Sequence, residues 1–139
     1  SRRVRRVCLE AMGDIPTPAA LEIILQELDT TDPVLASIAL DAAGKTADPR
    51  AVNRIIARLE TLPAHRWSPS AVEALGRLNA ARALPLLRQG FQQGTRPIKV
   101  AILKASRAIG GRQATKLLIH ASISQDISVR RTAQDLLTL

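Results

Sequence analysis

The chain has 139 residues, a formal net charge of +8 and an aromatic content of only 1%. Alanine, leucine, isoleucine and valine must therefore fill the core, which favours closely packed helices over an aromatic-rich sheet. The single cysteine, Cys8, excludes an internal disulfide and a cysteine-based metal site. The longest uncharged run, nine residues from Leu117 to Gln125, is shorter than the roughly 20 residues that span a membrane.

The first predicted helix contains Val4-Arg5-Arg6, and the same three letters return near the C-terminus at Val129-Arg130-Arg131. The offset between Val4 and Val129 equals four steps of about 31 residues, a period typical of helical repeats. We expect Val4 and Val129 to face the core, and Cys8, in the same apolar helical pattern, to be a buried and unreactive thiol. The motif therefore marks an architectural unit.

Glycine and alanine positions repeat at the same period. The glycines follow one another at steps of 31, 32 and 34, and we predict that each ends a first helix in the left-handed conformation. They are Gly13, Gly44, Gly76 and Gly110. An alanine near the start of each second helix recurs at steps of 31, 32 and 31, at Ala20, Ala51, Ala83 and Ala114.

This register predicts an all-α chain of about four and a half helix-turn-helix repeats in a single domain. The helices are expected at residues 2–12, 19–28, 33–43, 49–61, 68–75, 81–92, 97–109, 112–123 and 127–138. The repeats cover about residues 1–31, 32–62, 63–95, 96–125 and a final half repeat at 126–139. We predict that Thr31 or Asp32, Asp48 and Ser68 cap helices, and that turns contain Pro16 and Ala47.

The chain ends are interpreted as those of a piece of a larger protein, because no initiator methionine is present. If the array was cut, the outer side of the last helix should be apolar, and Leu136, Leu137 and Leu139 are compatible with that. The arginines at the start (Arg2, Arg3, Arg5 and Arg6) permit a second hypothesis, a segment beside the cytoplasmic face of a membrane. Otherwise we expect a cytoplasmic protein.

The repeat unit Val-Arg-x-x-Ala/Cys-x-x-Ala/Leu-Leu/Met-Gly, a turn often containing Asp-Pro, and Ala-Leu-x-x-Leu/Ile-Leu resembles the short HEAT-like repeat, including the variety found in phycobilin lyases. The resemblance covers essentially the whole chain. Repeat three departs from it at Trp67-Ser68-Pro69, and repeat four lacks the arginine after Val100-Ala101. The resemblance implies a right-handed α-solenoid whose second helices line a concave surface that commonly holds another macromolecule.

Charge is distributed unevenly along the chain. Residues 1–60 carry a net charge of −1 and residues 61–139 carry +9. No acid lies between Glu73 and Asp126, a run that contains nine bases. They are Arg77, Arg82, Arg88, Arg96, Lys99, Lys104, Arg107, Arg112 and Lys116. Such asymmetry can attract an acidic partner, and the alternative is a solvated, arginine-rich surface.

The aligned second helices predict two rows of surface residues. One row is Glu22, Asn53, Pro85 and Lys116, and the other is Gln26, Ala57, Gln89 and His120. Charge grades from acidic to basic along them, which favours a protein partner over a uniform polyphosphate. Trp67, beside two prolines, is expected either to cover the apolar edge of repeat three or to act as an exposed anchor. The candidate partner-binding residues are Arg54, Arg58, Trp67, Arg88, Lys116 and His120.

No catalytic pattern is recognisable. His65 and His120 are far apart, and paired carboxylates and a phosphate-binding glycine loop are missing from the sequence. We therefore expect no enzyme, no cofactor and no metal, and a non-catalytic scaffold that binds a protein, with an acidic protein as a candidate partner. Two alternatives stay open: a nucleic-acid-binding module that uses the basic C-terminal half, and an accessory lyase-type enzyme.

Overall fold

A computed structural model describes residues 2–15, 17–46 and 48–139, so the predicted turn residues Pro16 and Ala47 lie outside the described residues. In this part of the chain all regular structure is helical. The first helices of the repeats are α1 (Arg2–Asp14), α3 (Pro33–Thr46), α5 (Pro69–Arg77), α7 (Arg96–Ile109) and α9 (Ile127–Leu137). The second helices are α2 (Pro18–Glu27), α4 (Val52–Thr61), α6 (Leu84–Gln93) and α8 (Arg112–Ala121).

Local capping chemistry explains where several helices begin. The Thr17 hydroxyl accepts a hydrogen bond from the Ala20 amide at 3.1 Å, and the Ser68 hydroxyl accepts one from Ala71 at 3.4 Å. An Asp32 carboxylate oxygen accepts from the Val34 amide at 2.9 Å. Proline occupies the first position of α2, α3 and α5, where its missing amide hydrogen costs nothing. The predicted caps Asp32 and Ser68 are confirmed, and Asp48 caps a 3-10 helix, Pro49–Ala51, that leads into α4.

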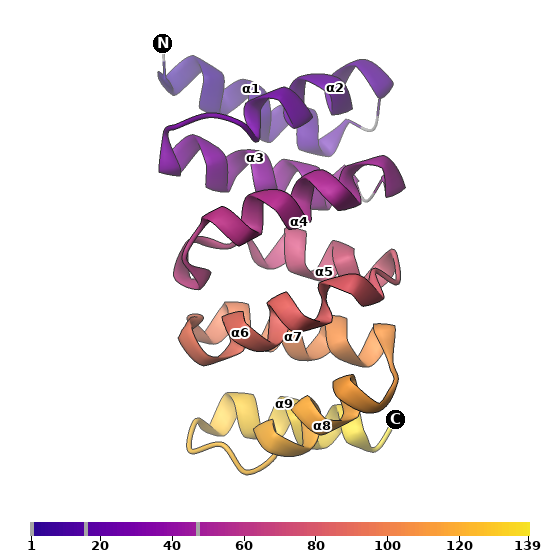
Figure 1. The fold of residues 1–139 in the computed structure, drawn as a ribbon. Helices are drawn as coiled ribbons and strands as arrows, with labels where there is room; N and C mark the ends of the chain where they lie inside the picture. The colour runs from indigo at the N-terminus through magenta and orange to yellow at the C-terminus, as the bar shows by residue number, and fades with distance from the viewer. Residues whose placement is uncertain (1, 16, 47) are drawn as a thin grey trace.

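The helices form an elongated stack with the two termini at opposite ends (Figure 1). Consecutive first helices pack on one another, α1 on α3, α3 on α5, α5 on α7 and α7 on α9. Between the two helical layers runs one aliphatic core. Its fully buried side chains include Ile24, Leu40, Ile55, Leu75, Leu87 and Ile102. The predicted all-α repeat solenoid is confirmed.

Three of the four glycines near the ends of the first helices have a different role from the predicted one. Helices α1, α3 and α5 continue through Gly13, Gly44 and Gly76, and of the four predicted closing glycines only Gly110 has a left-handed backbone, with φ of 77°. A Cβ on Gly44 would lie 2.4 Å from the Ser70 carbonyl carbon, and one on Gly76 would lie 2.6 Å from the Ala105 Cα. These glycines therefore allow backbones of successive first helices to touch.

The third repeat departs from the others around Trp67. A 3-10 helix, Ala64–Arg66, precedes this residue, and α5 then has only nine residues. Gly44 meets Ser70 and Ala71 of α5, which lie about one turn earlier in the repeat register than Ala42 and Ala105, the partners of Gly13 and Gly76. The irregular sequence thus coincides with a shifted contact between α3 and α5.

Two side chains predicted to be buried in α1 are exposed. Val4 is 60% exposed and Cys8 is also exposed, whereas Val129 and Ala133, at the same places in α9, are fully buried. The reason is that α9 packs against α7, the first helix of the preceding repeat, whereas within the described residues α1 packs chiefly on α2 and α3, which follow it. In α9, Leu137 is 38% exposed and Leu139, just beyond the helix, is 79% exposed, whereas Leu136 is half-buried.

None of the helices in the described residues is both long enough and apolar enough to cross a bilayer.

The glycine contacts predict an order of stability among three variants. Gly44→Ala should lower the free energy of unfolding most, by about 1–3 kcal/mol, because the new methyl group overlaps backbone atoms. Gly76→Ala should follow, and Gly13→Ala should be close to neutral, because its Cβ would lie 3.0 Å from the Ala42 Cα and alanine gains about 0.5–1 kcal/mol in a helix. Urea unfolding followed by circular dichroism measures this order, and a reversed order would contradict the close-contact role.

Candidate functional site

The two predicted rows of the second helices lie on one solvent-exposed surface. Each of the eight residues is exposed, which agrees with their predicted place outside the core. The first row is Glu22, Asn53, Pro85 and Lys116, and the second row is Gln26, Ala57, Gln89 and His120. We call this face, formed by α2, α4, α6 and α8, the second-helix surface.

A groove of about 520 Å³ opens on the second-helix surface between α6 and α8. Its polar side chains come from both helices, and each stands three or four positions from another of them on the same helix, a spacing that places them on one face. They are Arg88, Gln89 and Gln92 on α6, and Lys116 and His120 on α8. Phe91 and Leu117 also line the groove but are only 7% and 8% exposed, so they form an apolar floor. Pro85 completes the lining.

Three of the six predicted binding residues meet in this groove. Arg88, Lys116 and His120 line it together, although they belong to neighbouring repeats. The alignment of the second helices was sufficient to place them on one face. The floor could not be recognised from sequence, since Phe91 and Leu117 follow the ordinary core pattern of their helices.

Arg54 and Arg58 lie elsewhere and bind the preceding repeat. Arg54 donates from Nη2 to the Leu25 carbonyl at 2.8 Å and to the Asp29 carboxylate at 3.0 Å. Arg58 donates from Nη2 to the Thr30 carbonyl at 2.8 Å. Leu25 lies in the last turn of α2, where carbonyls lack an intrahelical donor. Both arginines thus join α4 to the C-terminal end of α2.

Trp67 is not an exposed anchor. Its side chain is only 6% exposed, and Nε1 donates to the carbonyls of Leu59 and Leu62 at 3.0 and 3.1 Å. A Cβ on Gly90 would lie 2.2 Å from Cζ3 of the ring, so Gly90 leaves the space that the indole fills. The alternative prediction, that Trp67 covers the apolar edge of repeat three, is confirmed.

Several other arginines also join successive repeats. Arg77 donates to the Gly44 carbonyl at 3.0 Å and Arg107 donates to the Leu136 carbonyl at 3.1 Å, both in the last turn of a helix. Such contacts satisfy free carbonyls and place a cation at the negative end of the helix dipole. Sequence reasoning missed them because their acceptors are backbone atoms. The available signal was the separation of donor and acceptor, 33 and 29 residues, which is about one repeat.

The acid-free run is therefore less available for binding than its formal charge indicates. Besides Arg77 and Arg107, Arg82 bonds to the Asn53 side chain and Arg96 to the Asp126 carboxylate. Lys99 is placed 5.6 Å from the centre of the Phe91 ring. Four bases of the run have neither a hydrogen bond nor an ion pair within the described residues. They are Arg88, Lys104, Arg112 and Lys116.

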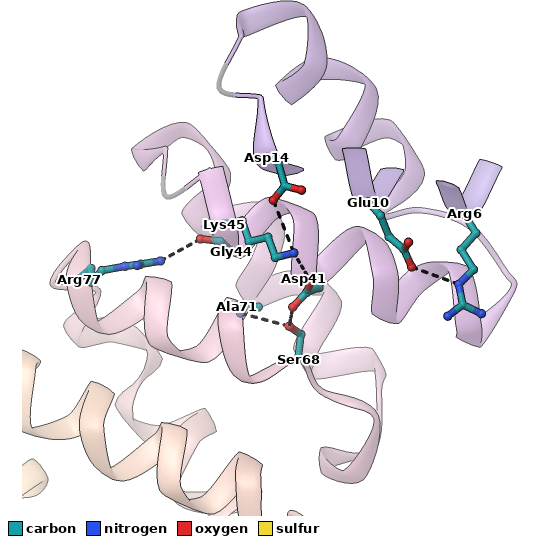
Figure 2. A network of polar contacts seen from close by, with 9 residues as sticks. All are labelled: Arg6, Glu10, Asp14, Asp41, Gly44, Lys45, Ser68, Ala71 and Arg77. Carbon is teal, nitrogen blue, oxygen red and sulfur yellow. Dashed lines mark hydrogen bonds and ion pairs between the residues drawn. The ribbon is translucent and has the colours of Figure 1, made fainter. Parts of the chain in front are cut away.

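A polar network in the layer of first helices connects α1, α3 and the start of α5 (Figure 2). Lys45 lies 3.8 Å from the Asp14 carboxylate of α1 and 3.4 Å from Asp41 within α3. Asp41 then accepts a hydrogen bond from the Ser68 hydroxyl at 3.1 Å. The charges of Asp41 and Asp14 raise the pKa of Lys45 above its ordinary value. All these groups are engaged with one another, so the network supports the stack.

Asp126 connects α7 to the start of α9. Arg96 Nε donates to its carboxylate at 2.9 Å, and the amides of Ser128 and Val129 donate to the other oxygen at 2.9 and 3.3 Å. The pKa of Asp126 is lowered below its ordinary value, most strongly by the hydrogen bond from Arg96 and next by the one from the Val129 amide. The ionised form is thus both a helix cap and a contact between repeats.

The part of the chain that the structure describes holds no group of three or more histidine, cysteine or acidic side chains that could bind a metal ion.

Comparison with known families identifies the repeat. Residues 4–30 and 70–93 match the PBS lyase HEAT-like repeat. The first stretch spans most of α1 and α2, and the second spans most of α5 and α6. The prediction of a HEAT-like repeat protein is confirmed. No curated protein matches the chain significantly.

The environment of Trp67 predicts a structural role that can be measured. Trp67→Phe should keep most of the ring burial but remove the Nε1 donor from two carbonyls, and should lower the free energy of unfolding by about 1–2 kcal/mol. Urea unfolding measures the loss, and acrylamide quenching of the wild-type indole should be weak in the folded protein. Strong quenching together with unchanged stability would indicate an exposed anchor instead.

The lowered pKa of Asp126 predicts a dependence of stability on pH. Because the unfolded chain binds this proton more tightly, the contribution is present above the unfolded pKa and is lost as pH falls through the lower folded pKa. Asp126→Asn should therefore be less stable than wild type at about pH 7, and the difference should shrink towards about pH 2. Thermal unfolding across this range tests it, with Asp135→Asn on the same helix as the control. An equal difference at both ends would contradict this prediction.

Proposed function

We propose that the chain is a non-catalytic scaffold that binds a protein partner on the second-helix surface. HEAT-like repeats form helical scaffolds, and this fold supplies a broad exposed face whose side chains come from successive repeats. The observation that carries the proposal is the groove between α6 and α8, where polar side chains of two repeats converge over an apolar floor. Such an apolar centre with a polar border is typical of protein interfaces.

Charge and aromatic content favour a protein over nucleic acid. A nucleic-acid surface aligns many free cations, and single strands also stack on exposed aromatic rings. Here Arg54, Arg58 and Arg82 contact neighbouring repeats, and Phe91 is almost fully buried. The first row of the surface also includes Glu22. Its mixed charge suits a partner with a charge pattern of its own.

The name of the matched repeat includes a lyase, and the side chains of the groove lining that are of a type used in acid–base or nucleophilic catalysis are His120 and Lys116. Its lining contains arginine, lysine, glutamine, histidine, proline, phenylalanine and leucine side chains. A general acid or nucleophile of the carboxylate, tyrosine or thiol kind is missing from this set. The scaffold proposal therefore uses the groove for recognition.

A bulky substitution distinguishes the second-helix surface from the first-helix layer. Gln89 is exposed and borders both the α6–α8 groove and a second groove between α4 and α6. Gln89→Trp should block docking without changing the charge, and should reduce partner recovery by about tenfold or more if the site is central. The control is Ala108→Trp, at an exposed position of α7.

The measurement is quantitative pull-down from native extract with wild type and both variants, compared by mass spectrometry. A binding partner should be lost with Gln89→Trp and retained with Ala108→Trp. Partners lost equally with both variants, or only with Ala108→Trp, would contradict the proposal. Circular dichroism of the variants checks that both remain folded.

A further inference from the structure

We propose that the groove between α6 and α8 is the docking site of an acidic peptide segment of the partner protein. In this arrangement carboxylates of the segment pair with Arg88 and Lys116, and an apolar side chain lies on Phe91 and Leu117. The inference rests on the proposed function and names the chemistry of the partner at one place on the second-helix surface.

The cations of the groove are free to bind. Neither Arg88 nor Lys116 has a hydrogen bond or ion pair with the described residues, and both are exposed. They lie on opposite sides of the groove, one on α6 and one on α8. Arg112, also free, precedes Lys116 by one turn on the same face of α8. With no acid in the lining, the groove offers positive charge without internal neutralisation.

The neighbouring groove shows the contrast. Between α4 and α6 the lining includes Glu60, and its cation Arg82 is bonded to the Asn53 side chain. An acidic segment would meet a carboxylate there instead of two free cations. Charge complementarity therefore places the acidic segment between α6 and α8.

The floor and border of the groove fit a peptide. Phe91 and Leu117 expose only small apolar areas at the base, enough to receive a side chain but not a stacked base. Gln89 and Gln92 supply amides that can both donate to and accept from a peptide backbone. The volume of about 520 Å³ lies within the roughly 300–1,000 Å³ of pockets that hold compact ligands, so it admits a short segment.

A long polyanion would find no continuous path along this surface. On α4 the row residues are Asn53 and Ala57, and Arg54 and Arg58 are engaged with the end of α2. On α2 the row begins with Glu22. Free positive charge on the second-helix surface is concentrated at α6 and α8, a patch of the size of a peptide motif.

The test uses a fluorescent peptide in which glutamates flank a central leucine, and a matched peptide with glutamine in place of glutamate. Fluorescence anisotropy measures their binding to the purified chain at low and at physiological salt. Arg88→Glu combined with Lys116→Glu should weaken binding of the acidic peptide by about tenfold or more. The glutamine peptide should bind weakly to every form, and added salt should weaken the acidic peptide.

The control variant is Lys104→Glu combined with Arg131→Glu. Both side chains are exposed, lie on the first helices α7 and α9 and have no hydrogen bond or ion pair with the described residues. Their reversal changes the net charge equally. Acidic-peptide affinity should stay within about twofold of wild type apart from a small long-range effect. Equal loss in both variants would overturn the inference, because net charge alone would then explain binding.

Two further outcomes would also overturn it. Tighter binding of a single-stranded oligonucleotide than of the acidic peptide, with the same dependence on Arg88 and Lys116, would assign the groove to nucleic acid. No binding of the acidic peptide would remove the acidic-peptide assignment. The scaffold proposal is judged separately by the loss of natural partners from Gln89→Trp, so the two failures are distinguishable.

Discussion

Direct backbone contact between successive first helices is the constraint on which the rest of the stack depends. Gly44 and Gly76 lie so close to the next helix that a single methyl group has no room, and Gly13 faces an alanine. Large side chains therefore cannot separate these helices, and the small residues fix their spacing. The second helices have no such glycine contacts in common, and grooves open between them. Close packing in one layer thus coincides with solvent-accessible grooves in the other.

Arginine contributes to this architecture in a way that net charge conceals. Guanidinium groups reach across one repeat to carbonyls at helix ends, as Arg54 does to Leu25 and Arg77 does to Gly44. Each contact uses a donor to satisfy an acceptor that the helix itself leaves free. The positive charge stays, but its side chain is held in place. Within the described part of the acid-free run, Arg88 and Lys116 lie outside these contacts and share a groove.

The helices and several of their caps could be predicted from sequence because they depend on neighbours along the chain. Asp32 followed by proline determines the start of α3, Asp126 caps α9 without a proline, and both predicted starts agree with the structure. The role of Gly44, the exposure of Cys8 and the acceptor of Arg77 could not be predicted, because each depends on what packs beside the residue. The groove lies between these cases: alignment placed Arg88 and Lys116 on one face, but its apolar floor depends on how α6 and α8 pack side by side.

The contact between Trp67 and Gly90 has a consequence for how such an array could change in evolution. The indole precedes α5 and the glycine lies within α6, so the two helices of the third repeat are matched to each other by shape. A recombination event that exchanged only one of them would place the ring against a side chain or leave a void. Because the indole also donates to the carbonyls of Leu59 and Leu62 at the end of α4, transfer of the third repeat alone would break those bonds as well, so Trp67 ties this repeat to the one before it.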